Sequence, residues 1–134
     1  MYVSETSLRV RYGETDQMGY AYYGNYAEYF EVGRVEALRQ LGMSYRSLEE
    51  KGIMLPVYTF SIKYLKPALY DDLLLIRTTV PELPGARIRF LYEAFNEKKE
   101  LLCTGEVVLV FIDKATKKPI PAPGYFVEKI RGYF

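Results

Sequence analysis

The sequence predicts an α+β domain in which a mostly antiparallel sheet curls around one long helix. Residues 26–41 form a long helical pattern with apolar side chains over much of its circumference. Residues 58–65 and 87–94 alternate apolar with polar side chains, as strands with one buried face do. Residues 73–80 and 101–112 are apolar on both faces, which favours strands inside a sheet or an interface. One long helix set apart from a run of strands is typical of the α+β class.

Capping residues set the expected ends of the helices. Asn25 is placed to cap the long helix, and Glu28 three residues later completes a capping-box pattern. Gly42 supplies a stop at the other end. Shorter helices are predicted over residues 44–51 and 123–131, the second of which begins at a proline suited to a first helical turn.

The composition predicts a single domain over residues 1–134. Hydrophobic residues make up 49% of the chain, enough for a core without a metal or disulfide staple. The 18 Lys and Arg residues nearly balance the 17 Asp and Glu residues, so the positive field of a nucleic-acid binder is absent. No apolar run is long enough to span a membrane. The lone cysteine, Cys103, and an N-terminus without a secretory signal pattern predict a cytoplasmic protein.

The chain contains no histidine. This excludes the Ser-His-Asp and Cys-His mechanisms, and it removes the commonest protein ligand of metal ions. We therefore expect no metal site. Any chemistry must use carboxylates, tyrosines, lysines or the dipoles of backbone amides.

A carboxylate lies in a loop just before the long helix. Alternation over residues 8–12 predicts a first strand, and residues 13–24 form a loop with glycines at both ends that contains Asp16. The first amides of a helix have no internal partner, so they can hold a developing oxyanion opposite such a carboxylate. A thioester suits this apparatus, because a thiol of pKa roughly 8.5 leaves without strong acid catalysis. The carboxylate can attack the carbonyl or activate a water, and the sequence does not decide between these roles.

The alternative for Asp16 is structural. An isolated loop aspartate commonly caps a turn, and it can also pair with a nearby arginine such as Arg9 or Arg11.

The residues around Asp16 match a family pattern. The pattern is an Asp, a Gly three residues later, two mostly aliphatic residues, an aromatic pair, and a Tyr three residues after the pair. The matching residues are Asp16, Gly19, Ala21, Tyr22, Tyr23 and Tyr26, with Tyr20 a bulkier departure. In this stretch, and over nearly its whole length, the chain resembles the 4-hydroxybenzoyl-CoA thioesterase family of hot-dog proteins.

The resemblance implies a hot-dog fold and roles for residues of the motif. Asp16 becomes the catalytic carboxylate, and the backbone N–H of Tyr23 or of Gly24 becomes the donor that polarises the thioester carbonyl. The implied substrate-binding residues around them are Gly19, Tyr22, Asn25 and Tyr26. Many relatives have His where this chain has Tyr23, a difference that leaves a backbone role intact.

Further candidates lie on the predicted strands. Lys63, Arg87 and Arg89 fall on outward faces of the strands, and Lys66 lies at a strand end. These cations could bind the phosphates of CoA. Ordinary solvated surface positions explain them equally well. Tyr64 either contacts the ligand or closes a turn together with the nearby Pro67.

Two other reactive residues receive no catalytic role. Glu31 lies on the long helix, where some hot-dog enzymes place an acidic catalyst, but an ion pair with Arg34 explains it better. Cys103 lies in a strand with no histidine to activate it, so we interpret it as a core residue.

We therefore expect an acyl-CoA thioesterase that releases a free acid and CoA. CoA is part of the substrate, and no cofactor is expected. Leu65, Leu91 and Phe95 on the outer sheet face need cover, which predicts a homodimer that assembles into a homotetramer. The alternatives are a non-catalytic module that binds acyl-CoA or an acyl-carrier protein, and a hydratase or dehydratase. The acyl group is not specified by the sequence.

Overall fold

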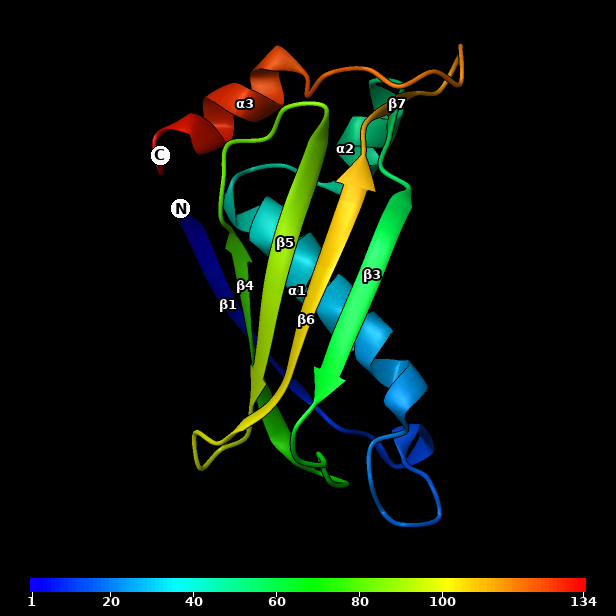
Figure 1. Cartoon of the computed structure of the whole chain (residues 1–134), viewed down its shortest axis with the longest axis vertical. Helices are drawn as coiled ribbons and strands as arrows, with labels where there is room; N and C mark the ends of the chain where they lie inside the picture. Colours follow the sequence, from blue (N-terminus) through cyan, green and yellow to red (C-terminus); the bar gives the residue numbers. More distant parts are fainter.

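Helix α1 (Tyr26–Gln40) lies against one face of a five-stranded antiparallel sheet (Figure 1). This computed structural model describes all residues, 1–134. The strand order is β1-β4-β5-β6-β3, and the bounds are β1 (Tyr2–Arg9), β3 (Val57–Tyr64), β4 (Leu73–Val80), β5 (Arg87–Phe95) and β6 (Leu101–Val110). The predicted α+β arrangement of one long helix and a mostly antiparallel sheet is confirmed.

The core lies between α1 and the inward faces of the central strands. In β4 and β5 every second residue is buried, as the alternation over residues 87–94 predicted. Phe30 of α1 stacks on Tyr92 of β5 with ring centroids 4.6 Å apart. Gly33 lets the helix approach β4 closely, because a Cβ atom there would lie 2.7 Å from side-chain atoms of Ile76 and Thr78.

Shorter elements close the end of the sheet farther from the start of α1 (Figure 1). They are α2 (Tyr45–Glu50), the paired strands β2 (Ile53–Met54) and β7 (Ile112–Asp113), and α3 (Gly124–Arg131). Ser44 caps α2 through its hydroxyl, and Gly42 has a φ of 81°, the left-handed conformation expected of a helix stop. No helix has the length and apolar character needed to cross a bilayer.

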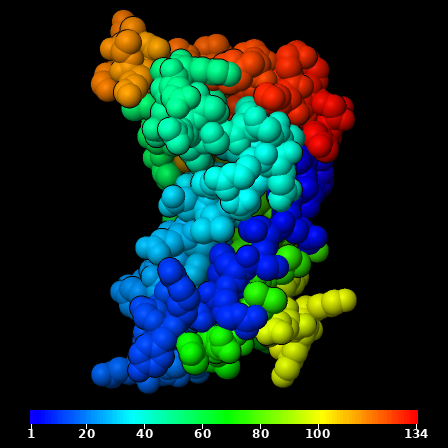
Figure 2. Space-filling model, turned by 180° about the vertical axis from the view of Figure 1, so that it is seen from behind, coloured from blue at the N-terminus to red at the C-terminus, as the bar shows by residue number.

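The segment around residues 10–25 differs from the prediction. The first strand covers Tyr2–Arg9, not residues 8–12, and Tyr12 is exposed at the start of a short 3-10 helix, η1 (Tyr12–Glu14). A second 3-10 helix, η2 (Tyr23–Asn25), leads directly into α1. Viewed from the side opposite the sheet, this segment and the outer face of α1 lie at the surface (Figure 2).

The predicted capping role of Asn25 is wrong. Asn25 has helical backbone angles, φ −77° and ψ −15°, because η2 already continues the turn on its N-terminal side. A capping side chain needs an extended backbone to reach forward to the next amides. The Asn25 side chain instead donates a hydrogen bond back to the carbonyl of Glu14, at 2.8 Å.

Candidate active site

A cleft of about 320 Å³ lies where the 16–23 loop, the start of α1 and the end of β3 meet. Its walls are mostly aromatic and apolar, with one carboxylate and one cation. The lining residues are Asp16, Met18, Tyr20, Ala21, Tyr23, Tyr26, Tyr64, Leu65, Lys66 and Pro67. The structure thus brings four of the predicted site residues, Asp16, Tyr23, Tyr26 and Tyr64, together around one cleft.

Asp16 is half-buried and held in a tight turn. One carboxylate oxygen, Oδ1, accepts hydrogen bonds from the amides of Met18 at 2.9 Å and Tyr20 at 3.2 Å. Gly19, with a φ of 77°, donates its N–H to the Asp16 carbonyl. The other oxygen, Oδ2, has no hydrogen-bond partner in the chain. Asp16 thus caps a turn with one oxygen and keeps the second oxygen free.

Neither nearby arginine pairs with Asp16. Arg9 contacts Asp71 at 3.8 Å, and Arg11 contacts Glu14 at 2.9 Å. The ion-pair alternative raised by the sequence is therefore wrong.

The turn at the start of α1 presents free backbone donors. Tyr23 and Gly24 are the first two residues of η2, so their N–H groups have no acceptor within it, and no other acceptor in the chain takes them. The hydroxyl of Tyr64 donates to the Tyr23 carbonyl at 3.0 Å and fixes this turn to β3. The ring of Tyr22 lies against Gly24, where a Cβ atom would come within 2.8 Å of it.

Aromatic rings form the floor of the cleft. Tyr26 packs edge-on against Tyr64 at 5.2 Å, and its hydroxyl accepts a hydrogen bond from the Ala68 amide at 3.3 Å. Burial raises the pKa of both Tyr26 and Tyr64, so both hydroxyls keep their protons at neutral pH.

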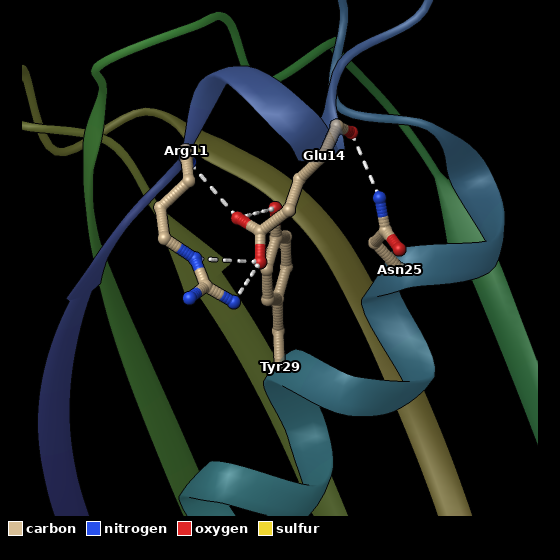
Figure 3. A network of polar contacts seen from close by, with 4 residues as sticks. All are labelled: Arg11, Glu14, Asn25 and Tyr29. Atoms are coloured by element: carbon tan, nitrogen blue, oxygen red, sulfur yellow. Dashed lines mark hydrogen bonds and ion pairs between the residues drawn. The ribbon is translucent and has the colours of Figure 1, made fainter.

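A polar network that the sequence analysis missed joins Arg11, Glu14, Asn25 and Tyr29 (Figure 3). The carboxylate of Glu14 accepts hydrogen bonds from Arg11 and from Tyr29, and the Glu14 carbonyl accepts one from Asn25. Burial raises the pKa of Glu14, but the hydrogen bonds from Arg11 and Tyr29 outweigh it and hold that pKa below its usual value. The three-residue spacing of Arg11 and Glu14 was the only signal in the sequence.

The predicted phosphate-binding residues lie outside the cleft. Lys63 is exposed on β3, Arg87 lies over the ring of Tyr58, and Arg89 pairs with Glu82 and Glu106 at 3.1 and 3.5 Å. Their contact with CoA stays a prediction. Lys66 does line the cleft, where it pairs with Glu100 at 2.7 Å.

The two residues without an assigned role are also located. Glu31 makes no ion pair with Arg34, which instead donates to the hydroxyls of Tyr45 and Tyr92, so the predicted pair is wrong. Cys103 is buried, and burial raises its pKa to about 12, which keeps the thiol protonated and unreactive.

Comparisons with known proteins identify the family of this chain. A family model described as the thioesterase-like superfamily matches residues 10–130. The acyl-CoA thioesterase YbgC of Haemophilus influenzae is 34% identical over 117 residues, which are 87% of this chain and 85% of YbgC.

Two solved structures extend the comparison. A DHNA-CoA thioesterase from Staphylococcus aureus superposes with a TM-score of 0.90 at 40% identity, covering 99% of this chain and 89% of that one. A 4-hydroxybenzoyl-CoA thioesterase, at 19% identity, shares the fold with a TM-score of 0.86 over 96% of this chain and 99% of its own. The predicted hot-dog fold is thereby confirmed, and the chain belongs to the thioesterase-like superfamily.

Proposed function

We propose that this chain hydrolyses acyl-CoA thioesters to a free acid and CoA, with Asp16 as the catalytic carboxylate. One observation carries the proposal: Asp16, whose Oδ2 is free, and Tyr23, whose amide is unpartnered, line one small cleft, and the unpartnered amide of Gly24 follows Tyr23 in the same turn. The names of the relatives, which are thioesterases acting on CoA thioesters, support the same reaction.

Two routes are compatible with this site. Oδ2 can attack the carbonyl carbon and expel CoA as thiolate, which leaves an anhydride that water then hydrolyses. Alternatively, Oδ2 accepts a proton from a water that attacks the carbonyl directly. In both routes the Tyr23 and Gly24 amides stabilise the negative charge that develops on the carbonyl oxygen. Neither route needs a metal or a cofactor.

We propose that the complete site forms in an oligomer, with residues 1–134 as one domain in each subunit. Strand β3 is an edge strand with unpaired backbone groups, and Val57, Tyr58 and Phe60 on it are exposed. Tyr23 and Met18 at the cleft are 64% and 69% exposed, which a second subunit would cover. A homodimer through β3, with a homotetramer formed through the outer sheet face, buries these groups. Light scattering on the purified protein measures the assembly.

The experiment measures thiol release from a panel of aliphatic and aromatic acyl-CoAs, including 4-hydroxybenzoyl-CoA. We expect release by the wild type and a loss of at least about a hundredfold in Asp16→Asn, because amide nitrogen neither attacks nor accepts the proton. Asp71→Asn, which alters an exposed aspartate in a surface pair, is the matched control and keeps its activity. Equal rates for Asp16→Asn and wild type would remove Asp16 from the mechanism. Binding of acyl-CoA without thiol release would instead indicate a non-catalytic binding module.

A further inference from the structure

The two halves of the proposed site come from different segments of the chain. Asp16 lies on the loop after η1, whereas the free amides lie on η2 at the start of α1. Their relative position decides the reaction, since a carboxylate and an oxyanion donor must lie on opposite sides of one carbonyl group. A contact that ties the two segments together therefore controls the geometry of the site.

Glu14 makes that connection through its backbone and its side chain. Its carbonyl accepts the Tyr22 amide and the Asn25 side chain, both at 2.8 Å, so it holds both flanks of the amide-bearing turn. Its carboxylate accepts the Tyr29 hydroxyl at 3.0 Å, one helical turn farther along α1 (Figure 3). Glu14 is only two residues from Asp16, so these bonds fix the Asp16 loop to the helix start.

Arg11 completes the set of donors around the carboxylate. Its backbone amide donates to Oε1 at 2.9 Å, and its Nε and Nη2 atoms donate to Oε2 at 3.2 and 2.9 Å. The Glu14 side chain is only 12% exposed. Hydrogen bonds to an ionised acceptor are stronger than those between neutral groups. The charged Glu14 carboxylate therefore holds Arg11 and Tyr29 in fixed positions.

We infer that Glu14 is a positioning residue, which holds Asp16 and the Tyr23–Gly24 amides in the relative geometry that thioester hydrolysis requires. This role rests on the proposed function. Glu14 acts through Asp16 and the turn, and it does not line the cleft itself.

The test uses Glu14→Gln, which keeps the size of the side chain. In either orientation of the new amide, its NH₂ group faces a donor of Arg11, either the guanidinium or the backbone N–H, and the ion pair is lost. A displacement of about 1 Å costs up to roughly a hundredfold in rate, so we expect kcat to fall by roughly ten- to a hundredfold with KM changed by less than about twofold. Glu36→Gln is the matched control, because Glu36 also pairs with an arginine three residues away but lies far along α1; its kcat stays at the wild-type value.

A double substitution separates positioning from general loss of structure. In the Asp16→Asn background there is no carboxylate left to align, so adding Glu14→Gln should lower the residual rate by less than about twofold. A purely structural effect would lower the rate by the same factor in both backgrounds. All rates are measured well below the melting temperature of each variant.

The outcomes are distinct. Wild-type kcat in Glu14→Gln, or an equal loss in both backgrounds, would overturn the role of Glu14 and leave the proposed function standing. Absence of thiol release by the wild type would overturn the proposed function, and the role of Glu14 with it. If Glu14→Gln fails to fold, Tyr29→Phe removes one bond to the same carboxylate while keeping the ring. A smaller fall in kcat, again absent in the Asp16→Asn background, supports the inference, and an unchanged kcat overturns it.

Discussion

Replacing Gly33 with alanine tests how closely α1 packs against the sheet. This packing also sets the position of the helix start at the candidate site. A Cβ atom at Gly33 would lie 2.7 Å from Ile76 Cγ2 and from Thr78 Oγ1. Both neighbours are buried and β-branched, so neither side chain swings away easily. The helix must therefore move from β4 by about 0.7 Å to restore an ordinary contact.

Two opposing effects determine how much Gly33→Ala changes the free energy of unfolding. Alanine is favoured over glycine in a helix by roughly 0.5–1 kcal/mol, whereas overpacking a core typically costs about 1–3 kcal/mol. The net effect is a loss of about 1–2 kcal/mol in the free energy of unfolding, which lowers Tm by roughly 3–8 °C in a domain of this size.

The measurement is urea and thermal unfolding of wild type and Gly33→Ala, followed by circular dichroism. Gly124→Ala is the control, because Gly124 begins α3 and a Cβ atom there meets nothing within 4 Å. That variant should be as stable as wild type or slightly more stable. A Tm for Gly33→Ala equal to or above that of wild type would refute the close packing of α1 on β4.

Four further predictions concern the site. Tyr64→Phe removes the bond to the Tyr23 carbonyl and should lower kcat by roughly two- to tenfold, whereas Tyr133→Phe at the far end of the chain should not. Since the folded pKa of Glu14 is depressed, its contribution to stability is present above its unfolded pKa of about 4.5 and is lost as pH falls through the folded value. Urea unfolding should therefore show wild type and Glu14→Gln differing at pH 7 and converging as the pH falls below about 4.5 and through the folded pKa of Glu14; a constant difference would refute this. Cys103 should resist thiol reagents in the native protein and react only on unfolding, so it adds no background to the thiol-release assay. With no histidine in the chain, the pH profile of kcat should show no inflexion near pH 6.5, the usual pKa of imidazole. Such an inflexion would contradict the proposal that Asp16 and backbone amides carry the reaction.

The sequence predicted the elements that have a buried face. Residues 73–80 coincide with β4, and residues 87–94 fall within β5 (Arg87–Phe95), because burial on one or both faces leaves a clear pattern of apolar residues. Asp16 was predicted to lie beside the start of the long helix, and it lines a cleft together with Tyr23 and Tyr26 at the start of α1.

The remaining features depend on contacts between distant segments. Strand β1 was misplaced because its buried positions include Ser4 as well as Tyr2, so its inner face is not uniformly apolar. The role of Glu14 could not be predicted, since Tyr29 reaches it only after α1 has packed against the loop. Asn25 satisfied the local rule for a helix cap, but the turn before it was already helical.

In a site without histidine, catalysis depends more on the positions of the carboxylate and the amides than on a group that changes its protonation state near neutral pH. The chain contains no histidine, so in the proposed mechanism the carbonyl is polarised by the Tyr23 and Gly24 amides without an imidazole. An amide acts on an oxyanion only within about 2.7–3.1 Å, and its dipole cannot be strengthened by a change of protonation state. The rate then depends on how rigidly the turn and the carboxylate are held. The bond of Tyr64 to the Tyr23 carbonyl and the bonds of Glu14 to Asn25 and Tyr29 hold these segments in place.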